Sequence, residues 1–497
     1  MTIVEYAHQE GLAATRAAGI EEQKRLGQFM TPPAIAMAMA ERACTGLNQP
    51  AVRLLDPAAG GGILAAAAVT VLLQRQIPPP RIEVTLYEVD PRLISPLRRL
   101  GQRMRRAGAR RGVIVSVVIR HSNFLLSPLA TQRRPLFDLI IANPPYFKLN
   151  KSSPEVEAHS YAVHGQPNIY GVFMAACAQL LTRGGKWCFI TPRSWTSGNY
   201  FAAARRHMLA WLRFDAFHVF ESRQNHFTDD AILQEAMITW ATAQAVPVPN
   251  VVLSTSNGLH DLHAAPIQQV PMNRIVGTDE SRMITLPTNA PNQLGPLTNT
   301  LQSLGLRVST GPVVAFRAEE FVAENSGPAT VPFLWMQHIH RMEISWPIAK
   351  KREHIRANAA SAWMLVENSP KVLLRRFSPK EDLRRVTAAP YLGELPGASI
   401  GLENHLNYIY RPGGVMNADE ALGLAAYLNS APVEAFFRGI AGTTQVNATE
   451  LRLLPMPSTQ QLSLIGRQCY PGMSLDQVDF VVDAVLNDFE ALLEAAA

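Results

Sequence analysis

The residues best suited to chemistry in this chain stand together in the segment Asn143-Pro144-Pro145-Tyr146. The apolar run Leu139 to Ala142 precedes them and predicts a buried strand that ends at this segment. Neither proline has a backbone N–H, and each restricts its own φ and the residue before it. The sequence therefore predicts a stiff loop that holds an amide and an aromatic ring in place. A chance occurrence of this four-residue string is expected about once in several hundred chains of this length. The alternative to a functional role is a turn that only ends the strand.

Such a loop suits the activation of a poor nitrogen nucleophile in a planar system. The lone pair of an exocyclic amine or an amide is delocalised, so the nitrogen attacks an electrophilic carbon slowly. The Asn143 side-chain oxygen and the Pro144 carbonyl can each accept one N–H of that nitrogen and favour the charge that develops during attack. Tyr146 offers a face on which the planar group can stack.

Strands and helices alternate through the first half of the chain and must position this loop. Three further strands are predicted, at residues 52–55, 82–87 and 113–119, and each ends in a segment suited to binding. These segments are the glycine turn Asp56 to Gly62, the acid Glu88, and the pair Asn123-Phe124. Because ligands of open α/β sheets bind at the carboxyl ends of the strands, we expect all four segments to meet at one edge.

The alternation continues to about residue 241 and predicts an α/β fold, a doubly wound Rossmann-like sheet of seven strands. From about residue 247 the helical periodicity fades and short strand-like runs replace it. We therefore expect three regions: a sheet domain at 1–245, a linker at 246–295, and a mixed α+β domain at 296–497.

Composition limits the class of protein. The chain has 497 residues, 47% hydrophobic content and a formal charge of +6, which fits a multidomain globular protein and permits a polyanionic partner. No apolar run has membrane-spanning length, and the four cysteines lack metal-ligand spacing, so neither a membrane nor a metal is expected. The expected location is the cytoplasm.

The predicted sheet edge suggests a nucleoside ligand. Glu88 is placed to accept both ribose hydroxyls, while Asn123 and Phe124 are placed to contact and stack on an adenine. No phosphate-binding lysine accompanies the glycine turn. These features together favour S-adenosylmethionine.

The order of these motifs resembles the gamma group of DNA adenine-N6 methyltransferases. The segment Leu26 to Pro33 is similar to that group's leading motif, although helix capping alone would explain Thr31. The resemblance implies a catalytic set and a cofactor set. The implied catalytic residues are Asn143, Pro144, Tyr146 and, as a second stacking aromatic, Phe227, with Phe220 as its competitor. The implied cofactor-binding residues are Thr31, Asp56, Pro57, Ala58, Ala59, Gly60, Glu88, Asn123, Phe124 and Pro145.

One position departs from the pattern of that family, which usually has aspartate where Asn123 stands. An amide oxygen can still accept a hydrogen bond from the amine of the cofactor's adenine. We expect the affinity for the cofactor to be altered.

Four polar segments of the second half of the chain, at residues 308–314, 374–378, 403–407 and 444–451, carry a second resemblance. They are similar to the recognition region of Type II restriction–modification methyltransferases of the PstI/BsuBI kind. These segments offer arginine for guanine and amides for adenine, the groups that read base edges. Each alone could equally be a capped turn or a phosphate contact. The implied DNA-binding residues are Lys148, Arg375, Arg376, Asn404, His405, Gln445 and Asn447.

The resulting hypothesis is an S-adenosylmethionine-dependent adenine-N6 methyltransferase. It would modify a flipped adenine in a short, specific duplex DNA site. We expect a monomer associated with the nucleoid of a prokaryote, and a cognate restriction endonuclease that acts separately. Two alternatives stay open. One is methylation of a protein glutamine amide or an RNA guanine amine, and the other is a non-catalytic DNA-specificity protein.

Overall fold

The computed structural model of the protein falls into two compact units, Met1–Leu286 and Pro287–Ala497, and each is treated by itself. The structure describes the chain except residues 28–29, 221–235, 245, 247, 257, 260, 278–279, 281, 287–293, 295–296, 350–351, 379–381, 383, 441–445 and 488–497.

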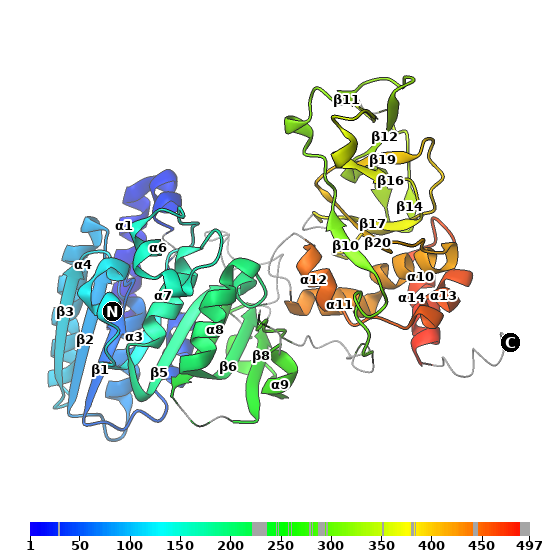
Figure 1. Ribbon diagram of the computed structural model, residues 1–497. Coiled ribbons are helices and arrows are strands. Elements are labelled where there is room, and N and C mark those ends of the chain that lie inside the picture. Colours follow the sequence, from blue (N-terminus) through cyan, green and yellow to red (C-terminus); the bar gives the residue numbers. More distant parts are fainter. Residues whose placement is uncertain are drawn as a thin grey trace. The chain divides into compact units, whose positions relative to one another are not determined.

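The first unit contains one nine-stranded sheet with the order β3-β2-β1-β4-β5-β7-β6-β8-β9. Figure 1 shows the sheet running from blue β3 to green β8. Its strands are β1 (Ala51–Asp56), β2 (Arg81–Glu88), β3 (Ile114–His121), β4 (Phe137–Ala142), β5 (Leu181–Pro192), β6 (Leu212–Phe220), β7 (Ala236–Ala243), β8 (Asn250–Ser256) and β9 (Ile267–Pro271). The strands predicted at 52–55, 82–87, 113–119 and 139–142 correspond to β1, β2, β3 and β4, and β3 begins one residue later than predicted.

Strands β1 to β5 are parallel to one another, and β7 runs antiparallel between β5 and β6. The chain moves outward from β1 through β2 to β3, then returns to place β4 on the other side of β1. This reversal creates a crevice beside the carboxyl ends of β1 and β4, where ligands of such sheets bind. The doubly wound α/β prediction is confirmed.

Two predictions about this unit are wrong, the count of seven strands and the linker at 246–295. Strand β8 pairs in parallel with β6, and β9 pairs with β8, so residues 250–271 extend the sheet. The unit continues to Leu286. Polar and proline residues in this region conceal the alternation that marks a strand, and only pairing with β6 makes the strand evident.

The buried strand β4 explains the two-layered core. Leu139 and Ile141 belong to one hydrophobic cluster, whereas Ile140 and Ala142 belong to the other, because successive side chains point to opposite faces. The first cluster includes residues of α1 (Ile3–Leu26), α2 (Pro33–Ala43), α3 (Ile63–Gln74) and α4 (Pro91–Ala109). The second includes residues of α5 (Pro128–Gln132), α6 (Pro154–Ala158), α7 (Ile169–Ala178), α8 (Ala202–Trp211) and α9 (Met272–Ile275).

Short 3₁₀ turns connect several of these elements in both units. They are η1 (Phe124–Leu126), η2 (Ser160–Ala162), η3 (Arg193–Trp195), η4 (Asn199–Phe201), η5 (Leu262–Ala264), η6 (Ala315–Arg317), η7 (Met336–His338) and η8 (Ala362–Met364). Among the described residues, no helix is long and apolar enough to cross a membrane.

The second unit combines small sheets with helices, which confirms its mixed α+β character. A four-stranded sheet has the order β10-β20-β17-β18, a five-stranded sheet the order β11-β15-β12-β19-β16, and β13 pairs with β14. The bounds are β10 (Arg307–Thr310), β11 (Val322–Ala323), β12 (Thr330–Leu334), β13 (Ile339–His340), β14 (Glu343–Ile344), β15 (His354–Arg356), β16 (Leu365–Glu367), β17 (Lys371–Arg375), β18 (Ala388–Tyr391), β19 (Ser399–Leu402) and β20 (Leu406–Tyr410). The helices are α10 (Ala418–Asn429), α11 (Ala431–Ile440), α12 (Ala448–Leu453), α13 (Thr459–Arg467) and α14 (Leu475–Asn487).

One buried acid ties β4 to β1 at the start of these strands. Asp138 is 2% exposed and accepts hydrogen bonds from the Arg53 backbone N–H, from Arg53 Nε and Nη2, and from Thr182 Oγ1. A buried carboxylate with this many donors holds its neighbours firmly, because each donor would otherwise lose its partner.

We expect Asp138→Ala to destabilise the sheet by about 2 kcal/mol, since the backbone N–H and the guanidinium of Arg53 lose the carboxylate that accepts their hydrogen bonds. Native-state hydrogen exchange on the full chain should report this loss at amides of β1 and β4. Glu83→Ala is the control, because the ion pair that Glu83 forms with Arg81 at 3.6 Å is exposed, and its loss should cost less than about 0.5 kcal/mol. Equal effects of the two substitutions would contradict the prediction.

Candidate functional site

A cavity of about 320 Å³ lies at the carboxyl ends of β1 to β4. This volume suits a small-molecule site, which typically spans roughly 300–1,000 Å³. The lining residues come from all four predicted segments and from the loops around them: Gly27, Met30, Thr31, Pro57, Ala58, Ala59, Gly60, Gly61, Ile63, Leu64, Tyr87, Glu88, Val89, Ser122, Asn123, Phe124, Asn143, Pro145, Phe147, Leu149, Glu155, Ile169 and Phe173. The predicted convergence of the strand ends is therefore observed.

The turn after β1 brings backbone to the cavity wall. Gly60 has a φ of +53°, which a residue with a side chain seldom adopts, and its N–H donates to Glu88 Oε2 at 2.7 Å. Asp56, one of the predicted cofactor residues, does not line the cavity and is only 1% exposed. Asp56 instead supports the turn, because its Oδ1 accepts a hydrogen bond from the Ala58 N–H at 3.3 Å.

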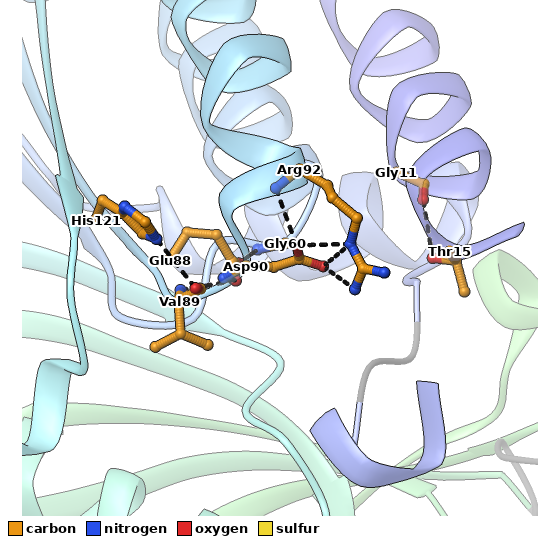
Figure 2. Close-up of polar contacts among 8 residues, drawn as sticks. All are labelled: Gly11, Thr15, Gly60, Glu88, Val89, Asp90, Arg92 and His121. Atoms are coloured by element: carbon orange, nitrogen blue, oxygen red, sulfur yellow. Dashed lines mark hydrogen bonds and ion pairs between the residues drawn. The ribbon is translucent and has the colours of Figure 1, made fainter. Parts of the chain in front are cut away.

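Glu88 is the last residue of β2, and its carboxylate accepts hydrogen bonds from backbone N–H groups. Besides Gly60, the N–H groups of Val89 and Asp90 each donate to Oε1 at 2.8 Å (Figure 2). Burial raises the pKa of the Glu88 carboxyl, and these three donors oppose that shift. The donors also fix the direction of the carboxylate, so its remaining acceptor positions are preorganised toward the cavity that Glu88 lines.

The helix after β2 begins at a second acid of the same segment. Asp90 accepts from the backbone N–H of Arg92 and forms an ion pair with its guanidinium at 2.7 Å (Figure 2). This cap fixes where α4 starts and thereby the position of Glu88 two residues earlier.

Asn123 and Phe124 follow β3, as the sequence predicts, and both line the cavity. Asn123 Oδ1 accepts from the Leu125 N–H at 3.0 Å and caps η1, while its Nδ2 donates to Glu155 Oε1 at 2.8 Å. Phe124 lies between Tyr87, at a ring-centroid distance of 5.3 Å, and Phe173, at 5.6 Å. These rings give the cavity an apolar, aromatic wall.

The loop after β4 is held by side-chain hydrogen bonds. Asn143 Nδ2 donates to Thr31 Oγ1 at 3.0 Å, and the Tyr146 hydroxyl donates to Asn143 Oδ1 at 2.6 Å. The same hydroxyl lies 3.0 Å from the Ile190 carbonyl oxygen, and the Tyr146 ring packs edge-on against Tyr170. Burial raises the pKa of Tyr146 far above its ordinary value, so its hydroxyl stays protonated.

The structure corrects the capping role predicted for Thr31. The N-cap of α2 is Pro32, and no side chain caps the helix there. The Thr31 hydroxyl instead binds Asn143, an interaction between segments that local sequence cannot reveal.

Gly27 is a residue of the site that the sequence reasoning did not single out. It has a φ of +59°, and a Cβ placed there would lie 2.8 Å from the Tyr146 backbone nitrogen and 3.2 Å from the Pro145 Cβ. The leading segment therefore packs directly on the Asn-Pro-Pro-Tyr loop, and only glycine allows this approach. The signal in the sequence is a glycine just ahead of Thr31.

Other predicted residues fall outside this cavity. Pro144 and Tyr146 belong to the Asn-Pro-Pro-Tyr loop but do not line the cavity. Lys148 follows this loop and is exposed. Phe227 and Gln445 lie outside the described residues. Phe220, the competitor of Phe227, is 7% exposed and belongs to the core.

The predicted DNA-binding residues of the second unit converge from three segments. The Arg376 N–H donates to the His405 carbonyl oxygen at 2.8 Å, and the Val446 N–H donates to the Arg376 carbonyl oxygen at 2.9 Å. Asn404, Arg375 and Asn447 flank these contacts.

Four of these side chains already have partners within the unit, among them Arg376, whose Nη1 donates to the Asn404 carbonyl oxygen at 3.3 Å. Arg375 Nε donates to the Ile339 carbonyl oxygen at 2.6 Å, and Asn447 forms a capping box with Glu450 at the start of α12. His405 Nδ1 lies 2.6 Å from Glu403 Oε1, with its side chain 48% exposed. Arg375 and Asn447 thus have structural roles that the sequence did not predict.

The residues of the cavity fit S-adenosylmethionine. Glu88 offers an oriented carboxylate suited to a ribose diol, and Phe124 offers a wall suited to adenine. Among the described residues that line the cavity there is no lysine or arginine, which disfavours a phosphate-bearing ligand. Among the described residues, no group of three or more His, Cys, Asp or Glu side chains is arranged to hold a metal ion.

Comparisons with known proteins show the family of this chain. Residues 120–227 match the family described as Eco57I restriction-modification methylase. Type II methyltransferase M.PstI of Providencia stuartii is 34% identical over 67% of this chain and 68% of its own length. Type II methyltransferase M.BsuBI of Bacillus subtilis is 30% identical over 94% of this chain and 96% of its own length.

The chain belongs to the Type II restriction–modification methyltransferases. Its membership confirms the predicted family, and the cofactor of this Type II methyltransferase is S-adenosylmethionine. The solved DNA complex of the Type IIL enzyme MmeI aligns over 97% of this chain and 75% of that chain, with 12% identity and a TM-score of 0.48. A likeness this distant says nothing about function.

The buried Asp56 gives the Type II methyltransferase a pH-dependent stability that can be tested. Burial raises the pKa of Asp56 from 3.8 to about 8, and the charge of Glu88 contributes to this shift to a lesser extent. Between these values the folded protein keeps a proton that the unfolded chain has released, so stability falls as pH rises from 4 toward 8.

We expect Asp56→Asn to stabilise the cofactor-free protein relative to wild type. The difference in the free energy of unfolding should grow by up to about 4 kcal/mol between pH 5 and pH 8. Scanning calorimetry of the full chain across this range measures the difference in melting temperature from wild type. Glu41→Gln, at an exposed position, should leave the pH dependence unchanged. A variant that melts lower than wild type at pH 8 would refute the prediction.

Proposed function

We propose that this Type II methyltransferase is of the gamma group and transfers the methyl group of S-adenosylmethionine to the N6 amine of an adenine in a short duplex DNA site. The observation that carries the proposal is the Asn143 amide, whose orientation is set by Thr31 beside a cavity suited to the cofactor. The modification would protect DNA from a cognate endonuclease that acts separately.

The orientation of the amide decides its chemistry. Because Asn143 Nδ2 donates to Thr31, its Oδ1 is left as the acceptor on the other side. An amide oxygen accepts two hydrogen bonds, so the contact with the Tyr146 hydroxyl is compatible with a second one from an adenine N–H. The Pro144 carbonyl oxygen, in the same extended loop, is suited to the other N–H of that amine.

These two acceptors favour the positive charge that grows on the amine as it attacks. They are fixed before the reaction, so no reorganisation is required when the charge develops. Bound S-adenosylmethionine supplies a sulfonium methyl group as the electrophile. The residues around Glu88 and Phe124 orient that group, and alignment of amine and methyl carbon supplies much of the remaining rate.

An adenine within a duplex cannot reach this site, so it must leave the stack. Tyr146 supports this step as a stacking face, since its hydroxyl end is anchored near Asn143 Oδ1 and the Ile190 carbonyl oxygen. Phe227 is proposed as the second aromatic.

Recognition of the DNA sequence is assigned to the second unit. The segments around Arg376, His405 and Val446 lie together, and they carry charged and amide side chains of the kind that read base edges. Lys148 is proposed to contact a phosphate. The protein is proposed to act as a monomer near the prokaryotic nucleoid, and its charge of +6 is consistent with a polyanionic partner.

Incubation of the full chain with methyl-labelled S-adenosylmethionine and mixed duplex DNA should yield N6-methyladenine. Asn143→Ala should lower the rate by at least about 10²-fold, because it removes a preorganised acceptor. Asn48→Ala, at an exposed position, should match wild type. Label found in protein or RNA instead of DNA adenine would refute the proposal.

Thr31→Val and Thr31→Ser separate the hydroxyl from the shape of residue 31. Valine cannot accept from Asn143 Nδ2, so the amide loses its fixed orientation and single-turnover methyl transfer should slow about 10-fold or more, a loss of roughly 1.4 kcal/mol. Serine keeps the acceptor and should stay within about threefold of wild type. If both variants slow equally, Thr31 acts through packing and not through Asn143.

A further inference from the structure

The cavity contains a side-chain pair that the proposed mechanism does not use, Asn123 with Glu155. Asn123 Nδ2 donates to Glu155 Oε1 at 2.8 Å, and both residues line the cavity next to Phe124. Glu155 lies in the first turn of α6, which follows the Asn-Pro-Pro-Tyr loop in the chain. The sequence reasoning named Asn123 but not Glu155.

The hydrogen bonds of Asn123 determine which group faces a ligand. Its Oδ1 accepts from the Leu125 N–H, so the oxygen is turned toward η1 and the nitrogen toward Glu155. Glu155, in contrast, has a carboxylate with about four acceptor positions. Within the described part of the chain, the bond from Asn123 is the one hydrogen bond to its side chain.

We propose that Glu155 accepts a hydrogen bond from the exocyclic amine of the cofactor's adenine and that Asn123 positions the Glu155 carboxylate. This inference rests on the proposed function, since it takes the cavity to hold S-adenosylmethionine. Phe124, buried against Tyr87 and Phe173, supplies the apolar wall for the purine ring beside the pair. The acceptor expected at residue 123 is thereby moved to residue 155.

Charge explains why the pair has this composition. A hydrogen bond from an amine to a carboxylate is roughly twice as strong as one to a neutral acceptor, so Glu155 is the better acceptor of the two. A second carboxylate at residue 123 would stand against Glu155 at hydrogen-bond distance, and the two charges would repel. An amide at residue 123 removes that repulsion and adds a donor.

The proposal predicts selectivity for an amine over a carbonyl on the purine. S-inosylhomocysteine carries a carbonyl oxygen where S-adenosylhomocysteine carries the amine, and this oxygen would face the Glu155 carboxylate. We expect the wild-type chain to prefer S-adenosylhomocysteine by about 10- to 100-fold in Kd, because a site built to accept an N–H rejects the analogue that lacks it.

Calorimetric titration of the full chain with both compounds tests this directly. Glu155→Gln should weaken S-adenosylhomocysteine about 10-fold and largely abolish the preference, since the glutamine amide can rotate and donate to the carbonyl. Glu157→Gln is the matched control on the same helix, because Glu157 is exposed and does not line the cavity. It should leave both affinities unchanged.

A swap of the pair separates its role from simple packing. Asn123→Asp alone should weaken S-adenosylhomocysteine about 10-fold, because two carboxylates then face each other. Asn123→Asp combined with Glu155→Gln restores one donor and one acceptor with exchanged positions. The double variant should therefore bind S-adenosylhomocysteine more tightly than Asn123→Asp.

The outcomes distinguish this inference from the proposed function. If wild type binds S-adenosylhomocysteine and Glu155→Gln keeps the full preference over the inosine analogue, the role of Glu155 is refuted while the proposed function stands. A double variant that binds no better than Asn123→Asp also refutes the pairing. If wild type binds neither compound, the proposed function fails, and this inference fails with it.

Discussion

The hydrogen bond from Asn143 Nδ2 to Thr31 Oγ1 is the constraint on which the proposed chemistry of this site depends. It joins residues 112 positions apart at 3.0 Å and decides which end of the Asn143 amide is the acceptor. The bond requires that the leading segment lie against the loop after β4, and Gly27 permits this because a Cβ there would meet the Tyr146 backbone at 2.8 Å.

A second constraint is the control of negative charge at the carboxyl ends of β1 and β2. Glu88 is oriented by three backbone N–H groups, whereas Asp56 is buried and accepts a longer hydrogen bond from the Ala58 N–H. The difference explains why the two acids have different roles. Glu88 presents an ordered acceptor to the cavity, while Asp56 lies beneath the turn with a pKa raised to about 8.

The two units divide the work of a Type II methyltransferase in different ways. The first places nearly every group of the proposed chemistry on consecutive strand ends, so one sheet positions them together. The second brings polar segments from β17, from the turn before β20 and from the residues before α12 into contact. Some of its polar residues stabilise the fold, as Arg375 does through the Ile339 carbonyl oxygen, which leaves fewer for the proposed reading of DNA.

The sequence by itself determined the family, the parallel strands and the order in which the segments at their carboxyl ends follow one another. It could do so because an apolar strand followed by a glycine, acidic or proline-rich turn is a local pattern. It also predicted that Glu88, Asn123 and Asn143 would meet, since the topology of a doubly wound sheet leaves one edge for them. It did not determine the partners of these side chains. The bond of Thr31 to Asn143, the pairing of Asn123 with Glu155, and the two strands added after β7 join segments far apart in the chain. Local propensity carries no information on such contacts, which exist only once the core has brought the segments together.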